Sequence, residues 1–490
     1  MSKSICIHIF RRDYRLDDNT TLIEACKTHD IVIPIFIFTS KQIDKKKNVY
    51  RSDNSVQFLC ESLADLDKQL KSYKSQLHIF YDDSRSNEYD ILESLIKMKE
   101  IESHLDIKTI SFNIDYTHYS KQRDAKIEEI CKKNNIDCLV KDDICLNPIG
   151  TVLTGGNKPY TKYTPFWRAS ASRDIRKPVK NTNNNFLQTN MTLYNKLKKH
   201  PFAITIDEVM KPEGKILASI NEKIPERGGR DNGLLILKGI TEWKDYDENR
   251  DLLTYKTTHL SPFNKFGCVS IREVYWTMRN KLGKDNGVIR QLFWRDFFYN
   301  LSHFHPEIYV ESALNPKYRN IKWKTDPTKF KAWCEAKTGF PVVDACMREL
   351  NTTGYMHNRG RLIVSSFLCR MLSIDWKEGE RYFAHKLYDY DPAQNNFGWQ
   401  VSGANSSGTT SRPLEQTILN PWRQSIQFDN EGIYIKKWCP ELENVKASHL
   451  HKWNEYAKEY ISKGIKYLEP IIDYNVEKEK NLKLYKKAFT

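Results

Sequence analysis

Short apolar runs alternate with longer amphipathic stretches over the first 145 residues of the chain. The apolar runs have the length of buried strands, and the stretches between them have the length and spacing of helices. The predicted strands are residues 5–10, 31–38, 77–81, 109–113 and 138–140, and the predicted helices are residues 20–27, 56–71, 89–99 and 121–133. This alternation predicts an α/β domain over residues 1–145, built on a doubly wound parallel sheet of five strands.

The pattern changes after this domain. Residues 146–244 lose clear periodicity and gather Gly, Pro and Asn, as a connector does. Beyond them the strand pattern does not recur, and we expect an all-α C-terminal domain over residues 245–490. Its predicted helices are residues 271–281, 288–304, 330–337, 342–352, 359–372 and 379–387.

Length and charge add to this picture. A chain of 490 residues exceeds one ordinary hydrophobic core, which agrees with two domains. The net charge is +15, from 77 Lys and Arg against 62 Asp and Glu. Such an excess points to a polyanionic partner, most simply a nucleic acid. A lysine-rich composition with indifferent surface lysines would give the same charge, so the count alone leaves both interpretations open.

The sequence predicts neither a membrane protein nor a secreted protein. The apolar run at residues 31–38 is far shorter than the roughly 20 residues of a membrane-spanning helix, and the N-terminus lacks the pattern of a signal peptide. We therefore expect an intracellular protein of the cytoplasm or nucleus, without a membrane segment. The 11 cysteines lack the spacing of zinc or iron–sulfur ligands, so we expect reduced thiols and no metal.

The turn after the first predicted strand holds Arg11-Arg12-Asp13-Tyr14 in place of a glycine-rich fingerprint, so no dinucleotide is expected there. A series of motifs in the chain resembles the photolyase/cryptochrome family, most of all its class I-type cyclobutane pyrimidine dimer photolyases. The motifs are IFRRDYRLDDN (9–19), TTHLSPF (257–263), QLFWRDFF (291–298), KTGFPVVDA (337–345), GYMHNR (354–359), DW (375–376), GERYF (379–383) and DYDPAQNN (389–396).

The resemblance covers nearly the whole chain and implies a light-driven enzyme. It implies a carbon–carbon lyase that uses fully reduced FAD to split pyrimidine dimers in UV-damaged DNA, after the lesion has been flipped out of the helix. The C-terminal domain would bind both the FAD and the lesion. By resemblance, the residues that hold FAD are Tyr246, Thr257, Thr258, Leu260, Ser261, Arg295, Asn358, Arg361, Asp389, Asp391 and Asn395.

The chemistry of these residues suits the parts of FAD. Hydroxyls and backbone N–H groups at a turn suit phosphates, although Thr257 and Ser261 could instead cap the helix predicted from residue 271. In the family pattern Arg361 pairs with Asp389, and Asn395 lies beside the redox-active nitrogen of the flavin. A neutral amide there tolerates a fully reduced flavin, which favours repair over signalling.

Three tryptophans resemble the electron-transfer chain of the family. They are Trp399, Trp376 and Trp323, in order from the flavin outward. Indole rings suit this role because they can be oxidised transiently when they pack in sequence. Ordinary core packing is the alternative interpretation of any one of them.

The residues expected at the lesion are Gln291, Trp294, Asn358, Leu362, Val401, Arg359 and Arg250. Trp294 resembles the usual stacking wall, and Val401 stands where a second aromatic residue is usual. Photolyases of the (6–4) photoproduct resemble this chain at Gln291, but they carry two histidines where this chain has Asn358 and Leu362. Neither of these side chains is a general acid near neutral pH, which favours dimer repair. Arg250 and Arg359, with Lys158, Lys162, Arg412 and Arg423, are candidates for the DNA backbone.

The antenna chromophore stays open. Thr117 stands where folate-binding members of the family have a glutamate, so folate is not expected, while a deazaflavin, a second flavin or no antenna remain alternatives. A monomer acting on single- or double-stranded DNA is expected. The alternative functions are (6–4) photoproduct repair, blue-light sensing as a cryptochrome, and nucleotide binding like that of electron-transfer flavoproteins, without DNA.

Overall fold

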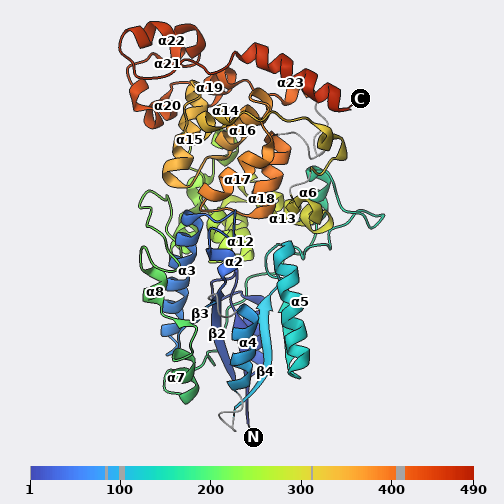
Figure 1. Cartoon of the computed structure of the whole chain (residues 1–490). Coiled ribbons are helices and arrows are strands. Elements are labelled where there is room, and N and C mark those ends of the chain that lie inside the picture. The colour runs from blue at the N-terminus through green and yellow to red at the C-terminus, as the bar shows by residue number, and fades with distance from the viewer. Residues whose placement is uncertain (1, 83–86, 99–104, 311–312, 404–413, 490) are drawn as a thin grey trace.

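The computed structural model describes residues 2–82, 87–98, 105–310, 313–403 and 414–489. The α/β domain, with the N-terminus, occupies one end of the molecule, and the helical domain occupies the other (Figure 1). Among the described residues, no helix combines the length and apolar character needed to cross a membrane. The same residues contain no cluster of His, Cys, Asp and Glu that could hold a metal ion.

The predicted five-stranded parallel sheet is confirmed. Its strands are β1 (Lys3–Ile9), β2 (Ile31–Phe38), β3 (His78–Tyr81), β4 (Leu105–Asn113) and β5 (Asp137–Lys141). They lie in the order β5-β4-β1-β2-β3, which places β1 at the centre, and a sixth strand pairs antiparallel with β3. That strand, β6 (Ala203–Ile204), comes from the connector and, with two residues, is too short to leave a pattern in the sequence.

Helices cover both faces of this sheet, as a parallel sheet requires. They are α1 (Thr20–Thr28), α2 (Ser40–Ile43), α3 (Asp53–Lys71), α4 (Glu88–Lys97) and α5 (His118–Lys133). The central strand shows why the apolar runs are continuous. Ile5 and Cys6 point to opposite faces of β1, and both are fully buried.

The connector contains four short helices and packs on both domains. The helices are α6 (Tyr163–Ala171), α7 (Thr192–Lys198), α8 (Ile206–Met210) and α9 (Arg230–Lys238), followed by the 3₁₀ turn η2 (Ile240–Trp243). Its β6 extends the sheet, whereas α6 lies beside α13 (Gly287–Phe304) of the helical domain (Figure 1). The connector therefore contributes side chains to the helical domain although it lies outside it in sequence.

The rest of the chain is helical, as predicted. The longer helices are α12 (Ile271–Leu282), α13, α15 (Pro341–Thr353), α16 (Asn358–Ser366), α17 (Trp376–Lys386), α22 (Trp453–Ser462) and α23 (Tyr474–Phe489). The shorter helices are α10 (Tyr246–Asn249), α11 (Ser261–Phe266), α14 (Pro327–Cys334), α18 (Pro392–Gly398), α19 (Pro421–Phe428), α20 (Ile433–Trp438) and α21 (Ala447–Leu450). The helix predicted over residues 359–372 ends at Ser366 and continues as the π-helical turn η5 (Phe367–Met371). A second π-helical turn, η6 (Trp399–Gly403), follows α18.

A buried ion cluster joins the α/β domain to α12. Arg272 donates to Asp143 (2.6 Å) and Asp18 (2.7 Å), and Arg15 also pairs with Asp143. Burial by itself would raise the pKa of Asp143, but Arg15 and Arg272 outweigh it and hold that pKa below its ordinary value. Breaking one of these pairs would leave an uncompensated charge in the core, so the cluster fixes how the two domains meet.

Candidate active site

The helical domain contains a cavity of about 590 Å³, hereafter the helical-domain cavity. It lies among α11, α13, α16, α18 and the turn before α11. Every residue predicted for FAD or for the lesion lines it, although these residues span positions 246 to 401. The lining includes Tyr246, Arg250, Thr257, Thr258, Leu260, Ser261, Gln291, Trp294, Arg295, Asn358, Arg359, Arg361, Leu362, Asp389, Asp391, Asn395, Trp399 and Val401.

One wall of the cavity carries an ion pair. Arg361 Nη2 lies 3.1 Å from Asp389 Oδ2, and the Ser261 hydroxyl donates to the same carboxylate oxygen at 2.7 Å. Burial works against the charge of Arg361, but Asp389 outweighs this and raises the pKa of the guanidinium above its ordinary value. The pair that the resemblance implies is therefore present, and it fixes Ser261 as well.

The turn before α11 does not cap the helix that begins at residue 271. Ser270 caps that helix, α12, by accepting from the backbone N–H of Glu273. Thr257 instead shares a hydrogen bond of 2.9 Å with the hydroxyl of Tyr355 across the cavity, and Leu260 is buried beneath the turn. The side chains of Thr257 and Ser261 therefore line the cavity and do not cap α12.

Asp391 is held by residues from outside the predicted set. It accepts from Arg12, in the turn after β1, and from the hydroxyl of Tyr299 on α13. Burial would raise the pKa of Asp391, but Arg12, Tyr299 and Arg295 lower it further than burial raises it. The carboxylate is therefore ionised, and it ties the α/β domain to the wall of the cavity.

Asn395 is oriented by Glu380. Its amide Nδ2 donates to the backbone oxygen of Glu380 (3.0 Å) and to its Oε1 (2.9 Å). These bonds assign the amide so that Oδ1 is the atom left to accept a hydrogen bond from the cavity.

The residues of the cavity fit FAD. Asn264 lines it, and its Oδ1 is a buried acceptor for which the described residues offer no donor. A buried polar atom of this kind calls for a partner outside the protein. The guanidinium of Arg295, in contrast, donates to the backbone oxygens of Ile144 (2.8 Å) and Asn264 (3.3 Å). Arg295 lines the cavity, and its contact with the cofactor stays a prediction.

The predicted lesion wall is on α13. Trp294 is half-buried, and its ring stacks on Tyr163 of the connector with ring centroids 3.6 Å apart. Arg359, predicted for the lesion and the DNA backbone, forms an ion pair of 2.7 Å with Asp251, which also lines the cavity. Arg412, also predicted for the backbone, lies outside the described residues.

The three predicted electron-transfer tryptophans run from the cavity outward. Trp399 lines the cavity and is 2% exposed, Trp376 at the start of α17 is 3% exposed, and Trp323 is half-buried. Gly379, one turn after Trp376, lies against Trp399: an added Cβ would come within 2.1 Å of its ring. The backbone next to Trp323 runs beside Ile374, just before α17, which places the outer tryptophan near the middle one.

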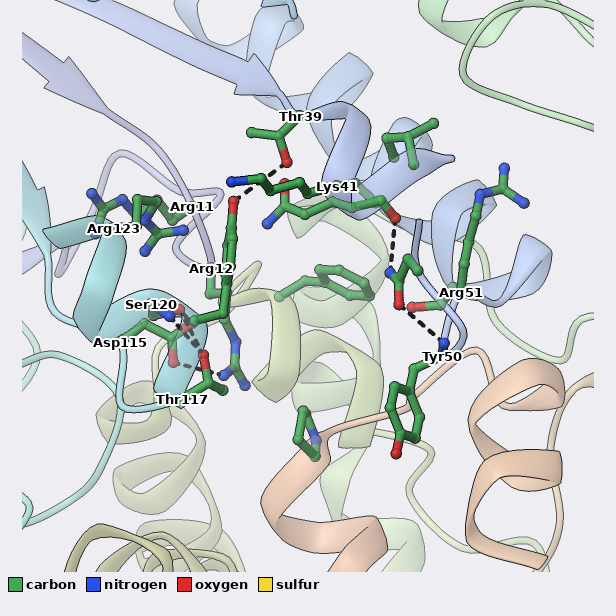
Figure 2. A pocket seen from close by; sticks show the side chains of 18 of the residues that line it. Arg11, Arg12, Thr39, Lys41, Tyr50, Arg51, Asp115, Thr117, Ser120 and Arg123 are labelled. Atoms are coloured by element: carbon green, nitrogen blue, oxygen red, sulfur yellow. Dashed lines mark hydrogen bonds and ion pairs between the residues drawn. The ribbon is translucent and has the colours of Figure 1, made fainter. Parts of the chain in front are cut away.

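A second cavity, of about 580 Å³, lies between the domains and is hereafter the interdomain cavity (Figure 2). Figure 2 shows Arg12 reaching Asp115, with Thr117 and Ser120 beside it. Thr117 caps α5 by accepting from the Ser120 N–H at 3.1 Å. The remaining labelled residues around it are Arg11, Thr39, Lys41, Tyr50, Arg51 and Arg123.

The interdomain cavity shares a wall with the helical-domain cavity. Lys265 and Tyr390 line both. Lys265 donates to the Ser55 hydroxyl (3.1 Å), and its ammonium lies over the ring of Phe266 (4.2 Å to the centroid). Burial, with Arg12 nearby, lowers the pKa of Lys265 to about 7. The wall therefore contains a lysine that can lose its charge near neutral pH.

A mostly parallel α/β domain followed by a helical domain around a cofactor-sized cavity is the architecture of flavin-dependent photoreceptor enzymes. Residues 6–183 match the family described as DNA photolyase, and residues 288–487 match the FAD binding domain of DNA photolyase. The chain belongs to the DNA photolyase family.

Two curated relatives match it over nearly their whole length. The deoxyribodipyrimidine photo-lyase of Buchnera aphidicola is 33% identical, over 98% of this chain and 96% of the relative, and that of Vibrio cholerae is 30% identical over 98% of each. A solved archaeal photolyase from Sulfolobus tokodaii, which contains two FAD molecules, superposes with a TM-score of 0.82 at 32% identity. That comparison covers 99% of this chain and all of the other.

The residues that hold the predicted side chains in place could not be identified from the sequence. Arg12 and Glu380 lie inside motifs that pointed to the family, but a motif does not show which side chain holds Asp391 or Asn395. Tyr163 left no signal, because 131 positions separate it from Trp294. Only the packing of α6 on α13 brings these two rings together.

Proposed function

We propose that this protein repairs cyclobutane pyrimidine dimers in DNA by light-driven electron transfer from reduced FAD to a flipped-out dimer. The observation that carries the proposal is that residues expected at the cofactor and residues expected at the lesion line one cavity. An electron can then pass directly from one ligand to the other. The enzyme is a deoxyribodipyrimidine photo-lyase in this reading, as its relatives are named.

The residues of the cavity divide the work. When bound, reduced FAD supplies the electron that opens the cyclobutane ring, and it regains that electron after the two bonds between the pyrimidines have broken. Asp389 and Arg361 hold the turn that carries Ser261. With its Nδ2 engaged by Glu380, Asn395 would offer its Oδ1 to the N–H that a reduced flavin carries. Trp294 supplies the flat surface on which an extruded base can stack.

Dimer repair is favoured over repair of the (6–4) photoproduct. Asn358 and Leu362 line the cavity where the (6–4) enzymes carry histidines, and neither can transfer a proton near neutral pH. Among the described lining residues the one histidine is His259, which packs on Tyr355 (4.3 Å between centroids) at the turn before α11. Cleaving the cyclobutane ring requires no obligatory proton transfer, so this cavity suits the dimer.

The basic rim supports binding to the DNA backbone. Arg250 and Arg359 line the cavity and are partly exposed, and Lys158, Lys162 and Arg423 are exposed. Contacts of this kind give an affinity that depends on salt but not on sequence, as a lesion-reading enzyme needs. We propose a monomer that acts inside the cell, where its DNA substrate is.

The interdomain cavity is proposed to hold a second, light-harvesting chromophore. It is about as large as the helical-domain cavity, and it combines an apolar floor that includes Phe10 and Ile127 with several cationic side chains. Thr117 cannot supply the carboxylate that the folate-binding relatives carry at its position. A second flavin is consistent with the archaeal neighbour that contains two FAD molecules.

A light-dependent repair assay tests the proposed function. Reduced protein is given two defined oligonucleotides, one with a cyclobutane thymine dimer and one with a (6–4) photoproduct. Repair of the dimer alone, and only under illumination, is the expected result. Repair of the (6–4) photoproduct would reassign the lesion. Repair of neither lesion, with FAD still bound and photoreducible, would favour the light-sensing alternative.

A further inference from the structure

The ring of Trp294 has one face covered by the protein itself. Tyr163, the first residue of α6, lies on it with ring centroids 3.6 Å apart and planes inclined by 6°. Helix α6 belongs to the connector and lies beside α13, which carries Trp294 (Figure 1). Trp294 also lines the helical-domain cavity, so the indole borders the cavity with a part of its surface that Tyr163 does not cover.

The surrounding fold imposes this stack. Aromatic pairs prefer offset or edge-to-face arrangements over a face-to-face one, because the ring quadrupoles repel when the faces meet. Two contacts hold Tyr163 in place nonetheless. Its hydroxyl donates to the backbone oxygen of Arg290 at 2.7 Å, and its ring meets the edge of Phe297 at 5.9 Å and 70°.

The hydroxyl of Tyr163 remains a donor at physiological pH, because burial raises its pKa above the ordinary value. The bond is made to the backbone of Arg290, one turn before Trp294 on the same helix. The bond therefore joins α6 to the helix that carries Trp294, whereas the ring of Tyr163 is the part that lies on the indole and sets its plane.

Other aromatic rings close the sides of Trp294. Phe297 lies edge-on at 5.8 Å and Phe298 lies tilted at 5.5 Å, both on α13. These rings restrict how far the indole can slide, but neither lies flat against its face. Among the described residues Tyr163 alone stacks on the indole, so it is the residue that sets the plane of the wall.

We propose that Tyr163 is a positioning residue for lesion recognition: it fixes the plane of Trp294 before the dimer arrives. The inference rests on the proposed function, in which Trp294 is the stacking wall. Because the wall is already ordered, binding of the lesion does not carry the entropic cost of immobilising a large side chain. This difference corresponds to about 3- to 10-fold in affinity. Undamaged DNA, which keeps its bases stacked in the duplex, does not use the wall and gains nothing from it.

Helix α6 has an independent anchor, so Tyr163 can be replaced without losing the helix. Phe166, one turn later, is 1% exposed and packs on Phe297 with centroids 5.3 Å apart. Two variants separate the functions of the tyrosine. Tyr163→Phe keeps the stacked ring and loses the hydroxyl, whereas Tyr163→Leu keeps an apolar contact and loses the stack.

The test compares the affinities of the full-length, FAD-loaded protein for a duplex with one thymine dimer and for the same duplex undamaged. Tyr163→Leu is expected to weaken dimer binding about 3- to 10-fold and to leave undamaged binding unchanged. Tyr163→Phe is expected to stay close to wild type. Equal weakening of both affinities, or an equal loss in the two variants, would overturn the proposal.

A double-mutant cycle shows whether Tyr163 acts through Trp294. In a Trp294→Ala background there is no wall to position, so Tyr163→Leu should cause no further loss of dimer binding. A loss as large as in the wild-type background would mean that Tyr163 contributes to binding by another route, and would overturn the inference.

A second measurement does not depend on DNA. Hydroxyl-radical oxidation of Trp294, quantified by mass spectrometry, should rise in Tyr163→Leu and not in Tyr163→Phe. If wild-type protein fails to distinguish dimer DNA from undamaged DNA, the proposed function fails while this measurement still reports whether Tyr163 holds the ring. Unchanged oxidation in Tyr163→Leu would overturn the positioning role itself.

Discussion

The two cavities are almost equal in size, about 590 and 580 Å³, but they are built in opposite ways. The helical-domain cavity is lined by residues of a single domain, and most of them lie in short, recognisable motifs. The interdomain cavity gathers side chains from the end of β1, from α2, α3 and α5, and from the helical domain. A site within one domain can be read from its motifs, whereas a site between domains exists only once the domains are joined.

Cations outnumber acids among the described lining residues of both cavities. In the helical-domain cavity the cations are Arg250, Lys265, Arg295, Arg359 and Arg361, and the acids are Asp251, Asp389 and Asp391. In the interdomain cavity the cations are Arg11, Arg12, Lys41, Arg51, Arg123 and Lys265, and the acids are Glu88, Asp115 and Glu380. The cavities differ in where the ion pairs lie: Arg361 and Arg359 pair with acids of the same lining, whereas Arg11 and Arg51 pair with Asp124 and Asp53, which do not line the interdomain cavity. The excess of cations at both sites favours ligands that bring negative charge of their own.

The largest effect is expected from breaking a matched pair. Arg361→Leu leaves the carboxylate of Asp389, which is 8% exposed, without its cation. The carboxylate is then free to turn away from Ser261, whose hydroxyl donates to it. Because Arg361 is partly exposed, we expect a loss of about 2 kcal/mol in unfolding free energy, below the usual cost for a fully buried pair. FAD should be lost with it. The measurements are urea unfolding and the FAD-to-protein ratio after gel filtration.

The control for this variant is Arg381→Leu on α17, where the arginine forms an exposed pair with Glu378. Such pairs contribute about 0.5 kcal/mol or less, so FAD should be retained. Binding of a chromophore in the interdomain cavity should survive both variants. If Arg361→Leu keeps its FAD, the pair is a structural feature of the domain and has no part in holding the cofactor.

The next largest effect concerns the proposed electron-transfer path through the tryptophans. This path starts at the helical-domain cavity, because Trp399 lines that cavity and does not line the interdomain cavity. Trp399→Phe replaces an oxidisable indole at the cavity wall with a phenyl ring that is much harder to oxidise. Photoreduction of oxidised FAD by an external thiol should slow about tenfold or more, whereas chemically reduced protein should repair dimers at the wild-type rate. Absorbance changes under blue light measure the first quantity.

Trp453→Phe is the matched control, because Trp453 is also fully buried but lies in another part of the helical domain. It should leave photoreduction unchanged. Normal photoreduction in Trp399→Phe would show that electrons enter by a route that bypasses Trp399. Trp376 and Trp323 would then be ordinary packing residues.

The same contrast explains how far the sequence could lead. Continuous apolar runs predicted the strands, which are buried on both faces, and apolar positions at helical spacing predicted the helices, which are buried on one face. The motifs predicted the lining of the helical-domain cavity, down to the pairing of Arg361 with Asp389. Strand β6 escaped prediction, because two residues form no pattern.

Contacts between distant segments could not be predicted. Arg12 binds Asp391 across 379 positions, and Tyr163 stacks on Trp294 from the connector, which carries no periodicity of its own. The interdomain cavity could not be predicted for the same reason. Its residues are ordinary members of helices and turns until the domains meet, and nothing local to Lys265 indicates that it would be desolvated there.

The smallest effect is expected at the wall that the two cavities share. The pKa of Lys265 is about 7 in the folded protein and about 10.4 in an unfolded chain, so between these values only the unfolded state binds the proton. Stability should therefore rise with pH from about 7 to 10. Lys265→Met removes this dependence. From pH 7 to pH 9 the unfolding free energy of wild type should gain about 1 kcal/mol relative to the variant, less than the full linkage value because the side chain is only half-buried.

Lys68→Met is the control, since Lys68 is exposed and Asp231 raises its pKa, which keeps it charged at both pH values. Urea unfolding of FAD-loaded protein at the two pH values measures the difference. If the unfolding free energies of wild type and Lys265→Met change in parallel between the two pH values, Lys265 stays charged at both. Both ligands would then have to accommodate a permanent positive charge in the wall between the cavities.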